Sequence, residues 1–148
     1  MTSVKTNMSN SPVTKRKTTA EALEELFQAL GDRTRVRLLN LMADGEVCVC
    51  FFVEVLDEPQ PKISRHLAYL RSAGLVSTSR DGKWISYAIA PPEHPTVRAA
   101  FDAVMATLKD DRDLQRDRVA LARACCSTRA PEQLRRAPRP AIANNAAT

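Results

Sequence analysis

The chain has 148 residues, of which 44% are hydrophobic and 26% charged, with a net charge of +5. This length accommodates one domain with a hydrophobic core and is too short for two ordinary domains. No apolar run approaches the roughly 18 residues of a membrane span and no secretory signal begins the chain, so a cytoplasmic protein without a membrane partner is expected.

The positive charge is unevenly distributed. Residues 1–17 carry four basic side chains and no acid, and residues 127–148 carry four arginines and one glutamate. Neither segment has periodicity, which predicts disordered basic tails at 1–17 and 127–148 around one domain at 18–126. Within that domain the charged residues of 60–83 are five bases and one acid, whereas residues 44–58 carry five acids and no base. A positive face is one interpretation, and two ordinary solvated faces are the other.

Two short amphipathic helices are expected first. Thr18 or Thr19 caps a helix that ends at Gly31, because hydroxyl oxygens favour the N-cap and glycine favours the C-terminus. Asp32 caps a second helix, which ends before Asp44. Apolar residues at helical spacing give each helix a buried face, formed by Leu23, Leu26, Phe27 and Leu30 in the first and by Val36, Leu39 and either Leu38 or Met42 in the second.

Two prolines separate the next segments. Residues 47–56 form an apolar run that fits either a strand or a helix. Pro61 suits the first turn of a helix, so a helix is predicted to start near Gln60 or Pro61 and to stop at Gly74. Its buried residues are expected to be Ile63, Leu67 and Leu70.

A hairpin and a long helix complete the domain. Residues 76–80 and 83–89 flank Asp81-Gly82, a dipeptide that favours a two-residue turn with positive φ. From Thr96 to Cys125 apolar residues recur at helical spacing around a charged interruption. This order predicts a mainly α protein with a β-hairpin wing (α+β), a winged helix-turn-helix that forms a homodimer through its first and last helices. An ordinary packed α+β domain is the alternative.

Three segments are more specific than this pattern. The strings LFQALGDRTRVRLLNLMADGEVCVC, QPKISRHLAYLRSAGLV and RDGKWISYAIAP resemble the ArsR (ArsR/SmtB) family of metalloregulatory repressors, particularly its arsenite-responsive branch. The similarity runs from about Leu26 to Pro91. This resemblance implies a homodimer that binds an inverted repeat in double-stranded operator DNA and dissociates from that DNA when trivalent arsenic or antimony binds to the protein.

The residues available for DNA contact agree with that resemblance. A recognition helix presents its first turns to the major groove, where Gln can read adenine and Arg can read guanine. Tyr69 and Trp84 are interpreted as packing residues, and the arginines of 33–37 as the solvated side of the second helix. The predicted DNA-binding residues are Gln60, Lys62, Ser64, Arg65 and His66 in the helix, with His66 equally readable as structural, and Arg80 and Lys83 beside the hairpin tip.

Four cysteines form two close pairs, Cys48 with Cys50 and Cys125 with Cys126. Thiolates select soft ions such as As(III) and Sb(III), although free cysteine is also a common core residue. The family's arsenite site reads C-x-C-x-x-C, and the third position here is Val53. The alternatives are that two thiolates suffice, with water or a small thiol as third ligand, or that Cys125 or Cys126 of either chain supplies the third.

Helix geometry constrains the Cys48–Cys50 pair. The side chains of residues i and i+2 in a helix point about 200° apart and cannot both coordinate one ion, whereas in an extended segment they lie on the same face. Chelation therefore requires the start of this helix to be, or to become, non-helical. The hypothesis is that binding distorts it and misaligns Lys62, Ser64 and Arg65 with the DNA groove.

Other functions fit less well. A zinc or cobalt site on the last helix would need histidines, and the aspartates at 110, 111, 113 and 117 are interpreted as a solvated face. No catalytic constellation or Gly-rich phosphate loop occurs, so no enzyme and no organic cofactor is expected. A thiol redox protein, a nucleoid-type DNA binder and, nearest, a redox-sensing or other thiophilic-metal-sensing repressor of the same fold are the alternatives.

Overall fold

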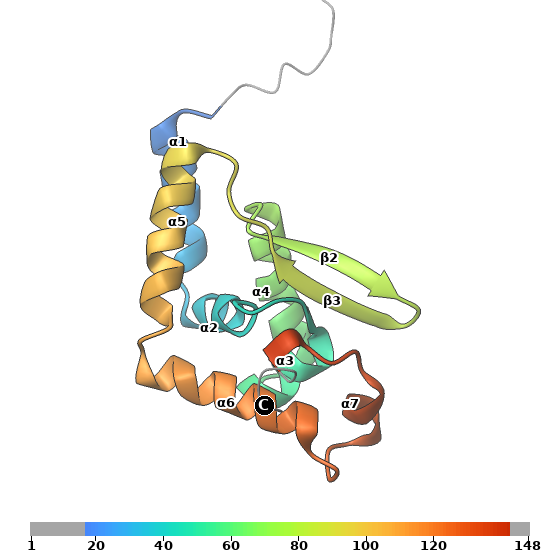
Figure 1. The fold of residues 1–148 in the computed structure, drawn as a ribbon. Helices are drawn as coiled ribbons and strands as arrows, with labels where there is room; N and C mark the ends of the chain where they lie inside the picture. The colour runs from blue at the N-terminus through green and yellow to red at the C-terminus, as the bar shows by residue number, and fades with distance from the viewer. Residues whose placement is uncertain (1–16, 143–148) are drawn as a thin grey trace, which may run out of the picture.

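The computed structural model describes residues 17–142; residues 1–16 and 143–148, which hold most of the first predicted tail and the end of the second, lie outside the described part. The chain folds as a winged helix-turn-helix, as the sequence predicts (Figure 1). Its elements are α1 (Thr19–Leu30), α2 (Arg33–Leu41), β1 (Val47–Cys48), α3 (Val49–Leu56), α4 (Gln60–Ser72), β2 (Val76–Asp81), β3 (Trp84–Ile89), α5 (Pro95–Leu108), α6 (Arg112–Cys126) and α7 (Glu132–Arg136).

The caps of the first two helices are where the sequence predicts them. Thr18 and Glu21 form a reciprocal capping box at the start of α1. The Asp32 carboxylate accepts a hydrogen bond from the Arg35 backbone N–H at the start of α2 (3.0 Å). These caps fix where α1 and α2 begin. The core includes Leu26, Leu38, Leu39, Met42, Phe51, Phe52, Ile63, Leu67 and Leu70.

The apolar run at 47–56 contains both a strand and a helix. Val47 and Cys48 pair with Tyr87 and Ser86 of β3 as a short antiparallel strand. Helix α3 starts at the next residue. The sheet therefore has three strands in the order β1-β3-β2. Strand β1 connects the start of α3 to the wing.

The wing turn lies one residue later than predicted. Asp81 pairs with Trp84, so the two-residue loop is Gly82-Lys83 rather than Asp81-Gly82. Gly82 takes a positive φ of 57°, and no other residue of the loop does. Glycine at the first loop position is the pattern of a type II′ turn, which lets Asp81 remain in β2.

The predicted long last helix is in fact two helices. It breaks between Leu108 and Arg112, where the Asp111 carboxylate accepts a hydrogen bond from the Leu114 backbone N–H (3.0 Å) and caps α6. Helix α5 packs beside α1, whereas α6 turns back across α2 and α3 (Figure 1). The break is possible because the polar run 109–113 buries nothing that would hold one straight helix.

Two expectations about charged residues are corrected by this turn. Asp117 is buried rather than solvated, because Arg37 donates to both its carboxylate oxygens (2.7 and 2.8 Å). Arg35 is likewise held within the protein: it donates to the carbonyls of Ala29 and Gln28 and lies over the Tyr69 ring (4.1 Å). Arg37 and Arg35 thus join helices rather than face solvent.

Residues 127–142 of the second predicted tail include a short helix, α7. Helix α7 buries Leu134, and Ala137 follows it into the core. The segment packs against α3 and α6 (Figure 1). Leu134 and Ala137 are the buried residues that hold this segment against the domain. Two apolar residues in a polar stretch are too few to show helical periodicity in the sequence.

Within residues 17–142 no helix is both long enough and apolar enough to cross a membrane.

Candidate functional site

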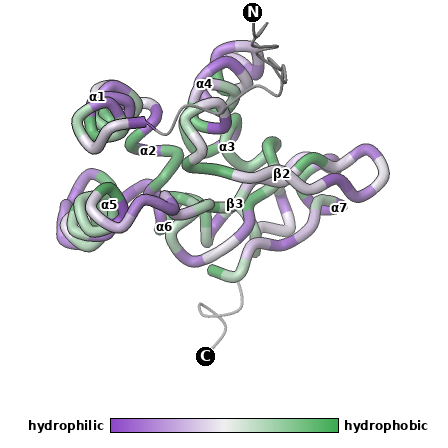
Figure 2. Tube along the Cα trace, turned by 90° about the horizontal axis from the view of Figure 1, so that it is seen from above, coloured by the Kyte–Doolittle hydropathy of each residue, from purple (hydrophilic) through white to green (hydrophobic). Residues whose placement is uncertain are grey.

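Helix α4 presents its polar residues on the side away from the core. Ile63, Leu67 and Leu70 are fully buried, which fixes the rotation of the helix. Gln60, Ser64 and Arg65 are consequently exposed. Hydrophilic residues follow α4 and the wing tip in Figure 2, in the arrangement that a groove-binding helix and a backbone-contacting wing require.

The remaining predicted α4 residues have partners inside the protein. Lys62 forms a partly buried ion pair with Glu58 (2.8 Å), and breaking a surface pair of this kind costs up to about 1 kcal/mol. His66 lies between helices, with its Nδ1 atom 3.5 Å from Arg35 Nη1 and 3.7 Å from Asp32 Oδ1. This placement favours the structural interpretation of His66.

Both basic residues of the wing are exposed. Arg80 donates a hydrogen bond to the Gly82 carbonyl across the turn (3.1 Å). The Lys83 ammonium lies 5.0 Å from the centre of the Trp84 ring. These contacts stiffen the tip and leave both cations facing solvent.

The sulfur atoms of Cys48 and Cys50 lie 3.4 Å apart. Cys48 is the N-cap of α3 with extended dihedrals (φ −70°, ψ 141°), and Cys50 stands in the first turn. The requirement for a non-helical start is therefore met without any unwinding, because the strand ends at Cys48. The part of the hypothesis that invokes helix distortion is not needed for chelation.

The hydrogen bond between the two thiols separates their acidities. Cys50 donates to the Cys48 sulfur, which lowers the pKa of Cys48 to about 6 against the opposing effect of burial, with help from Ser86 and the backbone N–H groups of Val49 and Cys50. The same bond, burial and the charge on Cys48 raise the pKa of Cys50. The two thiols of the pair are thus unequal in acidity, and Cys48 is the more readily ionised and more nucleophilic of the two.

A pocket of about 360 Å³ extends from this thiol pair to α4 and the wing. We call it the thiol pocket. Gln60 and Ser64 of α4, Lys83 and Trp84 of the wing, and residues of the C-terminal segment line it together with the cysteines. Tyr87 and Leu134 were not predicted as lining residues, because only the sheet register and the fold of residues 127–142 bring them to the pocket. The full lining is Cys48, Val49, Cys50, Val53, Glu54, Gln60, Ser64, Lys83, Trp84, Ile85, Tyr87, Pro131, Gln133 and Leu134.

The second cysteine pair does not join the first within one chain. Cys125 and Cys126 do not line the thiol pocket, where Pro131, Gln133 and Leu134 supply the C-terminal part of the wall. Burial raises the pKa of Cys125 to about 11, and the neighbouring Cys126 adds to the shift. No group of three or more Cys, His, Asp or Glu side chains within residues 17–142 is placed to hold a metal ion. A third ligand from the same chain is therefore not found.

Comparison with known proteins places these features in a family. Residues 32–78 match the bacterial regulatory protein, arsR family. The chain is 47% identical over 68 residues to the arsenical resistance operon repressor of Escherichia coli (strain K12), covering 45% of this chain and 58% of that repressor. It is 44% identical over 70 residues to an uncharacterized HTH-type transcriptional regulator of Methanocaldococcus jannaschii, covering 47% of this chain and 79% of that regulator. The chain belongs to the ArsR family.

A solved structure supports the same assignment for the fold. The homodimeric winged helix-turn-helix DNA-binding domain of a possible ArsR-family regulator from Mycobacterium bovis has a TM-score of 0.51 and 26% identity, covering 63% of this chain and 83% of that one. The ArsR-family relatives are transcriptional regulators and not enzymes, as the sequence predicts. The chain spans between 58% and 64% of the length of three arsenic-resistance regulators that it matches.

Proposed function

We propose that the protein is a DNA-binding transcriptional repressor that releases its operator when trivalent arsenic or antimony binds Cys48 and Cys50. One observation carries the proposal: the two sulfurs lie 3.4 Å apart in a pocket that α4 and the wing also line. Soft thiolates favour a thiophilic ion over a hard cation. The two sulfurs fit two positions of such an ion.

The DNA-contacting residues proposed are those on α4 and the wing. Gln60, Ser64 and Arg65 would reach base edges, while Lys62, Arg80 and Lys83 would contact phosphates. His66 would orient α4 through Asp32 and Arg35 rather than touch a base. The partner proposed is double-stranded operator DNA with an inverted repeat, since two-fold protein symmetry matches a palindromic site.

The proposed assembly is a homodimer through α1 and α5. These helices lie side by side at one edge of the molecule (Figure 1). Phe27 of α1, which the sequence places on the buried face of this helix, is instead 58% exposed at this edge. A homodimer through this edge would cover Phe27, and the M. bovis domain of similar fold is homodimeric.

Release of DNA follows in this proposal from the shared wall of the pocket. The Cys48 thiolate and the Cys50 thiol hold the inducer, and Gln60, Ser64 and Lys83 lie on the same pocket. Filling the pocket moves these side chains, or the wing relative to α4, away from the spacing that the DNA requires. No unwinding of α3 is invoked, because Cys48 is already extended.

The test is release of an operator-bearing promoter fragment. Arsenite is added to the complex of wild-type protein and DNA, and dissociation is followed by fluorescence anisotropy. Cys48→Ser and Cys50→Ser should bind DNA normally and fail to release it, whereas Cys126→Ser, at an exposed position outside the pocket, should behave as the wild type. Normal release by both pocket variants would show that the site is elsewhere.

A redox-sensing repressor is the second candidate, favoured by the same 3.4 Å sulfur separation and by the lowered pKa of Cys48. Hydrogen peroxide would oxidise the Cys48 thiolate to a sulfenic acid, and Cys50 would displace water to form a disulfide. Peroxide would then release DNA from a Cys125→Ala, Cys126→Ala protein, and dithiothreitol would restore binding. Release by arsenite under fully reducing conditions supports the first candidate instead.

A further inference from the structure

A second cavity lies along α6. It is an open groove of about 710 Å³ between α6, α3 and the segment that leads from α6 into α7. Glu54, Pro131 and Leu134 line both this groove and the thiol pocket. Cys48 and Cys50 do not line it. The groove is therefore a separate cavity that shares one wall with the thiol pocket, and we call it the α6 groove.

Half of the residues that line the α6 groove are apolar. Ala120 and Ala124 stand one turn apart on α6, and Val55 comes from α3. Alanine side chains fill little of the space between two packed helices, which leaves room for a groove. Val119, beside Ala120 on α6, is 50% exposed and so offers apolar surface to an incoming ligand.

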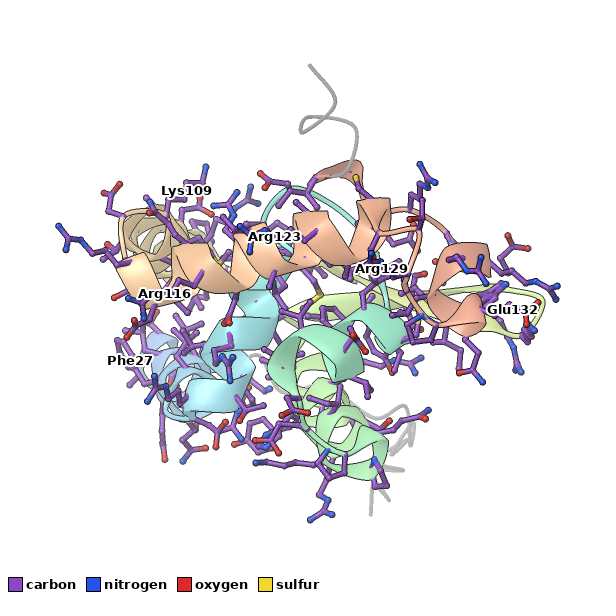
Figure 3. All side chains as sticks on the ribbon, turned by 90° about the horizontal axis from the view of Figure 1, so that it is seen from below. Phe27, Lys109, Arg116, Arg123, Arg129 and Glu132 are labelled. Atoms are coloured by element: carbon purple, nitrogen blue, oxygen red, sulfur yellow. The ribbon has the colours of Figure 1, made fainter. Side chains whose placement is uncertain are left out.

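The charged residues of the lining are four arginines and one glutamate. Arg112, Arg116 and Arg123 belong to α6, and Arg129 lies in the segment before α7 (Figure 3). All four are exposed. Arg116 forms an ion pair with Asp113, but among the described residues the other three arginines form none. Four positive charges against one negative charge give the lining a net charge of +3.

We propose that the α6 groove binds a small organic anion with an apolar body, such as a medium-chain carboxylate or an aromatic sulfonate. The acid group accepts hydrogen bonds from Arg123 and Arg129, because a guanidinium presents parallel N–H donors to such a group. Arg123 stands one turn beyond Val119 and Ala120, so the apolar body lies against these two side chains and leaves water. The volume falls in the range of small-molecule sites, roughly 300–1,000 Å³.

The other polar side chains of the lining are compatible with an anion, with one exception. The Gln115 amide donates to the Lys109 carbonyl (2.9 Å), and the Ser127 hydroxyl accepts from the Arg129 backbone N–H (3.2 Å). Both therefore have hydrogen-bond partners within the protein. Glu54 is the exception, because its carboxylate repels an anion. Removing that charge should strengthen binding, which gives the proposal a test in the opposite direction from the arginine substitutions.

The experiment titrates full-length protein with anilinonaphthalene sulfonate, a dye whose fluorescence rises when its rings leave water. Octanoate and octanol, which have equal chain lengths with and without a charge, are then added to displace the dye. Arg123→Ala and Arg129→Ala are compared with Arg135→Ala, because Arg135 of α7 is exposed and lies outside the groove. Val119→Glu is compared with Val119→Gln, which has the same size without the charge. Circular dichroism checks that each variant is folded.

The wild type should release the dye at an octanoate concentration at least tenfold lower than that of octanol. Arg123→Ala and Arg129→Ala should each weaken octanoate binding about fivefold, as expected for loss of one exposed charge pair. Val119→Glu should weaken it at least tenfold and Val119→Gln less than threefold. Glu54→Gln should strengthen it about twofold, and Arg135→Ala should match the wild type.

Several results would overturn the proposal. One is equal displacement by octanol and octanoate, and another is wild-type affinity for octanoate in both arginine variants of the groove. Binding of a glutamate-rich amphipathic peptide in place of octanoate would make the groove a protein-docking surface and would exclude the small-anion assignment. None of these results bears on release of DNA by arsenite, which depends on Cys48 and Cys50, so the two proposals are tested separately.

Discussion

Cys48 acquires its chemistry from its position between two elements. As the last residue of β1 it is extended, and as the N-cap of α3 it lies beside the first backbone N–H groups of the helix. Cys50 turns its thiol back to donate to the Cys48 sulfur. A thiolate is favoured near a helix N-terminus because the N–H groups there carry partial positive charge. The pair is therefore one acceptor and one donor, rather than two equivalent thiols.

This asymmetry predicts a distinctive titration. The ultraviolet absorbance of thiolate should rise as the pH passes through about 6, the pKa that the Cys50 hydrogen bond sets for Cys48. Cys48→Ser should abolish that step. Cys50→Ala should move it to higher pH, since the donor that stabilises the thiolate is lost. Cys126→Ala serves as the control, and a wild-type protein without a step near pH 6 would contradict the assignment.

At the scale of elements, the polar contacts of α6 decide where that helix lies. Arg37 and Asp117 form a two-pronged ion pair between α2 and α6, and both side chains are largely shielded from water. Asn40 adds a hydrogen bond from its amide nitrogen to the Leu114 carbonyl (2.9 Å). Leu121 of α6 is fully buried. Arg116 and Arg123 of α6 (Figure 3) are exposed to solvent.

Breaking the ion pair should destabilise the domain. Removing one partner leaves the other charge poorly solvated, so Arg37→Ala or Asp117→Ala should each lower the free energy of unfolding by about 2 kcal/mol. The double variant should lose less than the sum of the singles, by about 1 kcal/mol, in urea denaturation. Arg116→Ala, whose ion pair with Asp113 is exposed, is the control and should change stability little. Strict additivity of the two substitutions would show that the pair contributes no coupling.

The molecule as a whole has one edge formed by α1 and α5 and another formed by α4 and the wing (Figures 1 and 2). Phe27 lies at the first edge, on the outer side of α1 (Figure 3). Helix α6 folds back over the core and so leaves α5, at 14 residues, as the helix beside α1. The proposed dimer would thus use α5, which is shorter than the single helix that the sequence predicts from Thr96 to Cys125.

A charge at the first edge should separate the proposed dimer. Phe27→Glu removes an apolar side chain that is already exposed in the single chain and places two carboxylates near the symmetry axis. Analytical ultracentrifugation should show a monomer with unchanged circular dichroism, and affinity for an inverted-repeat fragment should fall at least 100-fold because the two half-sites no longer bind together. Gln28→Glu, an exposed neighbour with the same added charge, should remain dimeric. A dimeric Phe27→Glu protein would place the interface elsewhere.

Local rules were sufficient for three helices, α1, α2 and α4. The caps at Thr18 and Asp32, the start of α4 beside Pro61 and its buried Ile63, Leu67 and Leu70 all depend on residues within a turn or two of one another. Such features are visible in a sequence because the chain itself provides the hydrogen-bond partners and the periodicity. The choice of Cys48 and Cys50 as a candidate thiol pair rested on their spacing together with the resemblance to the family's C-x-C-x-x-C site.

Contacts between distant segments decided the remainder. The register of β1 against β3 makes Cys48 extended and so brings two thiols together, and the turn at residues 109–111 buries Asp117 against Arg37. Leu134 reaches the pocket only because α7 packs back on α3. Neither spacing nor propensity encodes such partners, since their stability arises from burial shared between segments that are 38 to 86 residues apart along the chain. Sequence alone therefore determined α1, α2, α4 and the donor atoms, and the tertiary structure determined where the last helix breaks and what surrounds the thiols.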